Sequence, residues 1–183
     1  MALTTLDDVK NFYGITGDKP EDNDLIEDLI DRFTSIFLNY CGRTSFSGTQ
    51  YTDYLDGDGY YLFPEQTPIT SVSGIWDDSN WLWADSALDA TTYRIANYNS
   101  IVALTPFTKG KNNIKIIYTA GFNPIPGDLK QVLIEEVVRS FKNRKSIDVV
   151  AITAADGSVS RLSKDLLPTT ILVLNRYRRK FVV

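Results

Sequence analysis

The longest amphipathic pattern in the chain lies near the N-terminus. From about Asp22 to Cys41, apolar residues recur every three or four positions, which is the spacing of one face of a helix. Acidic residues open this stretch, where they suit the positive end of a helix, and Gly42 follows as a stop. The segment Thr5–Tyr13 has the same spacing, a threonine cap and Gly14 behind it. Two helices are therefore predicted within residues 1–45.

The pattern changes between residues 50 and 120. Short aromatic and β-branched runs alternate with Gly, Pro, Asn and Asp, which is typical of strands joined by turns. The predicted strands are Tyr51–Leu55, Tyr60–Phe63, Ile69–Trp76, Tyr93–Ile95, Ile101–Leu104 and Ile114–Tyr118. Tight turns are expected at Asp53–Gly59 and over Thr108–Asn113. This segment is predicted to be a β-strand insertion between the second and third helices.

Helical spacing resumes over residues 127–145 and again after Pro168. Between these helices, residues 146–164 lack a helical period and carry a turn signal at Asp156-Gly157, so we expect a hairpin or mobile loop. Residues 165–183 are predicted to form a C-terminal helix and a basic tail. The expected fold class is mainly α (α+β), a small helical bundle with a β-strand insertion, in one domain over residues 1–183.

Composition narrows the class of protein. Of 183 residues, 43% are hydrophobic and 23% are charged, as in globular proteins. No apolar run approaches the ~20 residues that span a bilayer, so no membrane association is expected. The absence of histidine removes the usual general base and the commonest zinc ligand, and Cys41 has no partner for an internal disulfide. We expect no enzymatic activity, no metal and no cofactor.

The net charge of −4 hides a strong asymmetry along the chain. Residues 1–60 carry twelve acids and four bases, whereas residues 128–183 carry six acids and eleven bases. Opposite charges at the two ends can orient a head-to-tail contact between identical copies. The residues expected at such a subunit interface are Asp22, Asp24, Asp28, Arg139, Lys142 and Arg144.

Two local motifs suggest ligands. The acids of Asp53–Gly59 have part of the spacing of a calcium loop, but Tyr54 stands where the first ligand should be, so a tight β-turn is the preferred interpretation. The tryptophans Trp76, Trp81 and Trp83 could stack on sugars or bases. Neighbouring carboxylates would repel nucleic acid, so packing in the core or between subunits is preferred for these rings.

The basic C-terminus has three interpretations: a DNA contact, a solvated helix end, or a docking site for a protein partner. The last two together are preferred over DNA, because tyrosine and arginine are common interface anchors and the apolar residues behind them have no evident use within the chain. The residues expected to bind a partner are Leu172, Arg176, Tyr177, Arg178, Arg179, Lys180 and Phe181.

The order of these elements is similar to that of the head-tail connector (head-completion, adaptor) proteins of long-tailed bacteriophages. The segments that carry the resemblance are Tyr40–Thr44, Tyr54–Gly59, Phe63–Val72, Ile117–Phe122, Ile125–Val132, Asn143–Lys145, Leu167-Pro168 and Leu174–Arg179. Together they cover essentially the whole chain, although each alone is weak. The stretch from Trp76 to Leu104 is longer than in compact members.

The resemblance implies a structural adaptor subunit that forms a ring, of twelve copies in the virion, between portal and tail. It implies a portal protein and a stopper or tail-completion protein as partners, with DNA passing through the channel without sequence-specific binding. It also implies synthesis in the bacterial host cytoplasm, location at the head-tail junction of the virion, and a C-terminus that reaches the portal. The alternative function is an aromatic β carbohydrate-binding or interaction module of a phage tail or surface protein.

Overall fold

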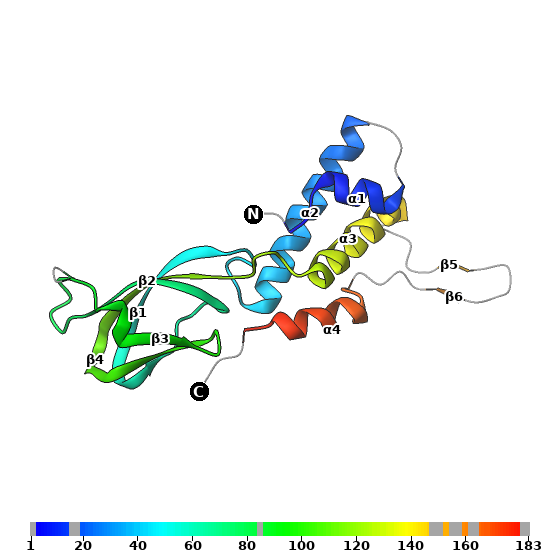
Figure 1. Cartoon of the computed structure of the whole chain (residues 1–183). Helices are drawn as coiled ribbons and strands as arrows, with labels where there is room; N and C mark the ends of the chain where they lie inside the picture. The colour runs from blue at the N-terminus through cyan, green and yellow to red at the C-terminus, as the bar shows by residue number, and fades with distance from the viewer. Residues whose placement is uncertain are drawn as a thin grey trace. The chain divides into compact units, whose positions relative to one another are not determined.

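The structure is a computed structural model that describes residues 3–14, 19–83, 86–146, 152–153, 159–160 and 165–179. The chain divides into two compact units, shown in Figure 1. The helical unit comprises Met1–Gly42 and Ile125–Arg178, and the sheet unit comprises Arg43–Pro124 and Arg179–Val183. The sheet unit is therefore inserted into the sequence of the helical unit. The assignment of residues 1–183 to a single connector domain stays a prediction.

The helical unit contains α1 (Leu6–Tyr13), α2 (Pro20–Cys41), α3 (Gly127–Lys142) and α4 (Pro168–Tyr177). Each lies where helical spacing predicts a helix. Thr5 and Asp8 form a reciprocal capping box at the start of α1, and α1 and α2 end at glycines in the left-handed conformation. Helices α2 and α3 pack side by side (Figure 1). Their buried faces include Ile26, Ile30, Phe33, Phe37, Leu129, Leu133 and Val137.

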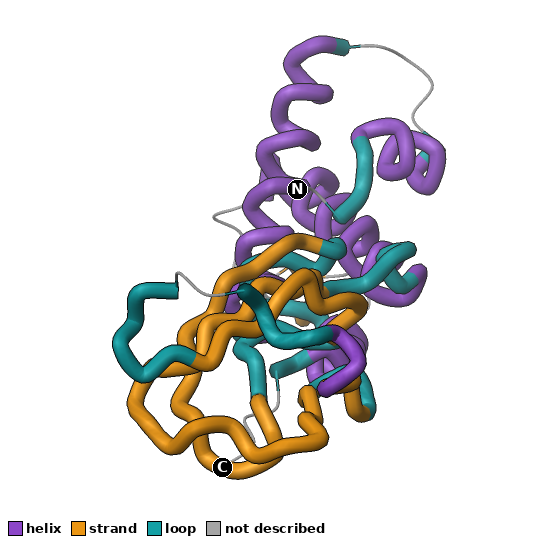
Figure 2. The backbone as a smooth tube through the Cα atoms, turned by 60° about the vertical axis from the view of Figure 1, so that its left-hand side comes forward, coloured by secondary structure: helices purple, strands orange, loops and turns teal. Residues whose placement is uncertain are grey.

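The sheet unit contains β1 (Thr49–Leu62), β2 (Ile69–Asp77), β3 (Tyr93–Ala96) and β4 (Ser100–Ala120). All pairings are antiparallel, in the order β1-β4-β2, and β3 also pairs with β4. Figure 2 shows these strands, in orange, as a strongly curved sheet. A separate apolar core lies within it, formed by Leu62, Ile69, Ile75, Ile101, Ala103, Phe107, Ile114, Ile116, Tyr118 and Ala120.

The turns predicted at Asp53–Gly59 and Thr108–Asn113 are wrong. Strand β1 runs through the first segment and β4 through the second, and the two segments pair with each other across shifts in register. Gly57 faces Gly110, and a Cβ atom at Gly57 would lie 2.0 Å from the carbonyl oxygen of Thr108. Gly57 therefore marks a place where the two strands approach closely, while Gly59 and Asn112 have the positive φ that turns also use.

The expected fold class, mainly α with a β-strand insertion, is also wrong. Of the residues that the structure describes, 40% are helical and 33% lie in strands, and the sheet has a core of its own. Four predicted strands merge into the two long strands β1 and β4. Their bulges interrupt the alternation of apolar and polar residues, so the sequence pattern underestimates their length.

Within residues 146–164, the described parts are β5 (Ile152–Thr153) and β6 (Val159–Ser160), which pair antiparallel. The turn predicted at Asp156-Gly157 lies outside the described residues. Among the described helices, none has the length and apolarity needed to cross a bilayer.

Candidate assembly surfaces

The start of α4 is held by a buried carboxylate on α3. Glu136 is 0% exposed and accepts hydrogen bonds from the Arg139 guanidinium, at 2.6 and 2.9 Å, and from the backbone N–H of Leu167, at 2.7 Å. Arg139 also donates to the carbonyl oxygen of Asp165. The buried charge is therefore paired and hydrogen-bonded, which is the condition under which a carboxylate is tolerated in a core.

The end of α4 is held by Asp128 in the first turn of α3. The Tyr177 hydroxyl donates to this carboxylate at 2.5 Å, and the Arg176 guanidinium lies 3.7 Å from it. Burial, together with this hydrogen bond, raises the pKa of Tyr177 to about 12. On the other side, Asn175 accepts a hydrogen bond from the Tyr40 hydroxyl at 2.9 Å. Both ends of α4 are thus fixed within the helical unit.

The residues predicted to bind a partner therefore divide into two groups. Leu172 is 65% exposed and the Arg176 side chain 71% exposed, so α4 presents both outward. Tyr177 bonds inward, and the Arg178 guanidinium lies 6.0 Å from the centre of the Tyr40 ring. In the sheet unit, Arg179 lies 3.8 Å from Glu65, while Lys180 and Phe181 lie outside the described residues.

The basic residues predicted at a subunit interface have partners in the same chain. Arg144 forms an ion pair with Asp22 at 3.1 Å, and the Lys142 ammonium lies 4.4 Å from the centre of the Tyr13 ring. Arg139 forms an ion pair with the buried Glu136.

The acids divide differently. Asp24 and Asp28 are exposed on α2, where they belong to an acidic face. The exposed acids of this face are Glu21, Asp24, Glu27, Asp28 and Asp31. Of the residues predicted at a subunit interface, the structure therefore leaves the acids Asp24 and Asp28 without a bound base among the described residues of the same chain, whereas the bases are engaged.

The three tryptophans make separate contacts in the sheet unit. The Lys115 ammonium lies 5.0 Å from the centre of the half-buried Trp76 ring. Trp83 packs against Tyr54, with 5.6 Å between the ring centres. Trp81 is 59% exposed, and its indole N–H donates to the carbonyl oxygen of Lys111. Trp76 and Trp83 thus have neighbours within the sheet unit and Trp81 faces solvent, while the preference for packing in the core or between subunits stays a prediction.

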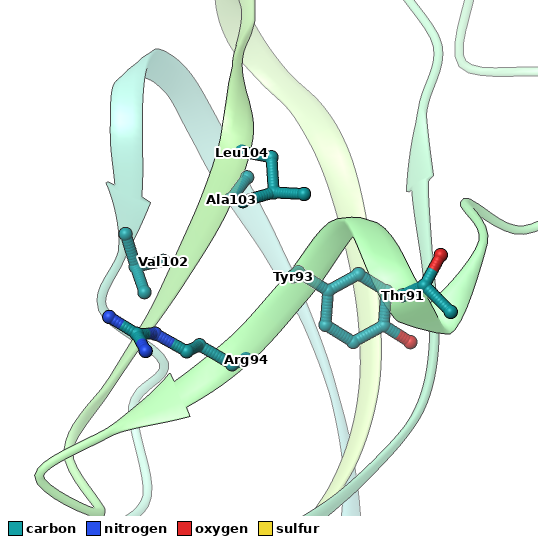
Figure 3. Close-up of a pocket in the computed structure, with 6 residues that line it drawn as sticks. All are labelled: Thr91, Tyr93, Arg94, Val102, Ala103 and Leu104. Carbon is teal, nitrogen blue, oxygen red and sulfur yellow. The ribbon is translucent and has the colours of Figure 1, made fainter.

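A small pocket lies between β3 and β4, with a volume of about 280 Å³ (Figure 3). Its lining residues are Thr91, Tyr93, Arg94, Val102, Ala103 and Leu104. Apolar side chains predominate in this lining, and Arg94 is its one charged member. No carboxylate is among these lining residues. The sequence pattern did not predict this pocket.

The described residues contain no group of three or more His, Cys, Asp or Glu side chains that could hold a metal ion. Of the acids that resemble a calcium loop, Asp53 and Asp56 have other partners. Asp56 forms an ion pair with Lys111 at 2.5 Å and accepts the backbone N–H of Asn112, and these contacts lower its pKa.

The head completion protein family matches residues 2–180, which is nearly the whole chain. The chain belongs to the head completion protein family. Membership makes it a bacteriophage virion structural protein and confirms the resemblance seen in the sequence segments. No curated protein matches the chain.

Solved structures of similar fold come from the neck of gene transfer agent (GTA) particles. A chain from the neck of the empty particle, computed with C6 symmetry, is 14% identical at a TM-score of 0.62, with 99% of this chain and 92% of that chain covered. A chain from the neck of the native particle, computed with C12 symmetry, is 15% identical at a TM-score of 0.54, with 90% of this chain and 85% of that chain covered. A third chain, from the virion of the native particle, is 14% identical at a TM-score of 0.57, with 99% of this chain and 92% of that chain covered. The head completion protein therefore shares their fold.

Proposed function

We propose that this head completion protein is a head-tail connector subunit that assembles into a ring of identical copies between portal and tail. The observation that carries the proposal is the family match over residues 2–180. The shared fold with neck proteins from particles computed with C6 and C12 symmetry supports a ring of twelve in the virion. The protein is made in the host cytoplasm and acts by recognising other proteins, without catalysis.

The outward face of α4 is the surface proposed to dock on the portal. Leu172 and Arg176 stand one helical turn apart and are both exposed, whereas Tyr177 keeps α4 in place through Asp128. An exposed leucine beside an arginine provides the apolar contact and the charged hydrogen-bond donor that interface cores favour. Lys180 and Phe181, outside the described residues, stay predictions from the sequence for a partner contact.

The acidic face of α2 is proposed to face the DNA channel. Acids such as Asp24 and Asp28 repel phosphates, so DNA passes without the multiple contacts that would slow it. The ring then extends the channel of the portal, and a stopper or tail-completion protein closes its other end.

The assembly is tested by measuring the mass of the purified protein with and without portal, by sedimentation velocity. A portal complex that contains a ring of this protein is the expected result. If the protein never exceeds its monomer mass on addition of portal, the connector proposal is wrong.

The docking surface is tested by deleting Arg176–Val183, which should abolish co-sedimentation with portal. Because this deletion also removes Tyr177, the point variants Leu172→Ser and Arg176→Ala provide the cleaner comparison. Each should weaken portal binding about tenfold, the effect of losing one interface anchor worth ~1.4 kcal/mol. Arg32→Ala, at an exposed base on α2, is the matched control and should bind as the unmodified protein. Unchanged binding by both the deletion variant and Leu172→Ser would exclude α4 as the docking surface.

A further inference from the structure

The loop after β2 presents two large apolar side chains to solvent. Trp81 is 59% exposed and Leu82 is 74% exposed. The loop extends beyond the end of the sheet (Figure 1). The Asp78 carboxylate accepts three backbone N–H groups, at 2.8 Å from Asn80, 3.0 Å from Leu82 and 2.9 Å from Trp83. These bonds hold the loop in one conformation, so the exposure of its apolar side chains is built into the structure.

The backbone of this loop is strained. Trp81 has φ of 58° and Trp83 has φ of 51°, in the left-handed region that bulky side chains rarely occupy. Strain of this kind persists only where surrounding contacts impose it, as Asp78 does here, and it is concentrated at functional surfaces. Two exposed apolar residues on a strained, fixed loop are the features of a preformed anchor for another protein.

The pocket between β3 and β4 has the complementary character. Val102, Ala103 and the Tyr93 ring give it apolar walls, and Leu104, 76% exposed, stands at its rim. Figure 3 shows the Arg94 side chain beside Val102. Within the described part of the chain, Arg94 forms no ion pair, so its guanidinium is available to stack on an incoming aromatic ring.

The loop and the pocket are separate surfaces of one sheet. Trp81 bonds to Lys111, which pairs with Asp56 on β1, whereas Val102 of the pocket lies opposite Tyr61 on β1. Asp56 and Tyr61 are five residues apart on β1, and shifts in register at Gly57 and Gly59 lie between them. Two different surfaces that fit each other generate a head-to-tail contact, which closes into a ring when it is repeated.

Charge favours the same pairing. The loop begins at two acids, Asp77 and Asp78, and Lys111, whose carbonyl oxygen bonds to Trp81, is already paired with Asp56. Arg94 is the one charged residue in the pocket lining, and the neighbouring Asp89 has its carboxylate bonded to the backbone N–H and hydroxyl of Thr91. Opposite charges would therefore orient the loop of one copy towards the pocket of another. A buried tryptophan covers 150–250 Å² on average, against ~800 Å² per partner in a stable interface, so the loop supplies an anchor and not the whole contact.

We propose that Trp81 and Leu82 of one copy insert into the β3–β4 pocket of the next copy around the ring. This inference rests on the proposed connector function and identifies the contact between neighbouring subunits. Asp78 acts as a positioning residue, because it fixes the loop that carries the two anchors.

Cysteine cross-linking tests the contact directly. The double variant Leu82→Cys/Leu104→Cys, as the full chain bound to portal, should form a ladder of disulfide-linked multimers under mild oxidation. The native Cys41 is 0% exposed, so the unmodified protein is the control and should give no ladder. Each single variant should also give none. Rings visible by electron microscopy without a ladder would overturn the inference and leave the connector function intact.

Mixing variants tests the head-to-tail geometry. Trp81→Ala/Leu82→Ser lacks the anchors and Leu104→Arg blocks the pocket, so each alone should need at least about thirtyfold more protein to assemble on portal. Mixed in equal amounts, they retain one intact anchor and one intact pocket per pair, and should form dimers that do not grow. Leu88→Ser, in the same connection between β2 and β3, is the matched control and should assemble normally.

Two outcomes would overturn the inference here. Assembly of either variant at the concentration that suffices for the unmodified protein would exclude the loop and pocket as the subunit contact. Failure of the unmodified protein to assemble on portal would instead refute the connector function, and this inference with it.

Discussion

Replacing Glu136 with alanine should destabilise the helical unit strongly. The substitution removes the carboxylate that accepts from Arg139 and from the N–H of Leu167. Removing one partner of a buried ion pair costs about 3–5 kcal/mol. The Arg139 side chain is 22% exposed and keeps its bond to the carbonyl of Asp165, so the lower end, about 3 kcal/mol, is expected. Glu136→Gln retains an acceptor for Leu167 and should lose about half as much.

Urea unfolding followed by circular dichroism at 222 nm measures this loss in the helices. With a slope of about 2 kcal/mol per molar urea, Glu136→Ala should lower the midpoint by about 1.5 M. The matched control is Glu135→Ala on the same helix, where the side chain is less buried and bonds to Gln131 in an exposed pair. The control should lose at most about 0.5 kcal/mol. Equal losses in the two variants would refute the assignment of Glu136 as the anchor of α4.

Three further predictions concern single side chains. Asn113→Ala should cost the sheet unit about 2–3 kcal/mol in unfolding followed by tryptophan fluorescence, because it leaves the buried N–H of Gly57 unpaired and removes the bond to the carbonyl of Thr108. The control is Asn99→Ala, at an exposed position, and an equal effect there would contradict the reasoning. The hydrogen bond that raises the pKa of Tyr177 stabilises α4 fully below pH 10, and this contribution should be lost as the pH rises from 10 towards 12. Tyr177→Phe should remove that part of the pH dependence of stability. An unchanged profile in this variant would rule out the contribution of Tyr177. Contacts with Lys130 and Thr5 lower the pKa of Asp8, so its contribution to stability is complete above about pH 4 and disappears as acid protonates the carboxylate. Asp8→Asn should flatten the acid side of the stability profile. A steeper profile would show that Asp8 does not stabilise the protein in its charged form.

The helices were predictable because their signals are local. The apolar spacing of α2, the capping box at Thr5 and the stop at Gly42 all lie within a few residues of the feature that they specify. The contacts that fix α4 have no such signal. Asp128 and Tyr177 are 49 positions apart, and only folding brings them together. Glu136 did offer a clue, since a glutamate on the apolar face of α3 with an arginine three positions on is unusual unless the two are paired.

The sheet was harder to predict because one residue type serves two purposes. Gly57 and Gly110 were interpreted as turn residues, yet they face each other across a bulge, where a side chain would clash. Only the register between two distant strands distinguishes these cases. The candidate surfaces were affected in the same way. Leu172 and Arg176 could be proposed from the sequence, whereas the Trp81 loop and the β3–β4 pocket depend on how the curved sheet is paired.

The insertion of the sheet unit within the helical unit also sets an order of events during synthesis. The apolar face of α2 leaves the ribosome early, but α3, which covers it, begins at Gly127, after the entire sheet has been translated. At a translation rate of about 5–20 residues per second, the apolar face of α2 stays uncovered for several seconds before α3 is synthesised. The sheet, whose strands are contiguous in sequence, has everything it needs to fold during that interval. The nascent protein should therefore be most prone to aggregation, and most dependent on host chaperones, just before α3 emerges.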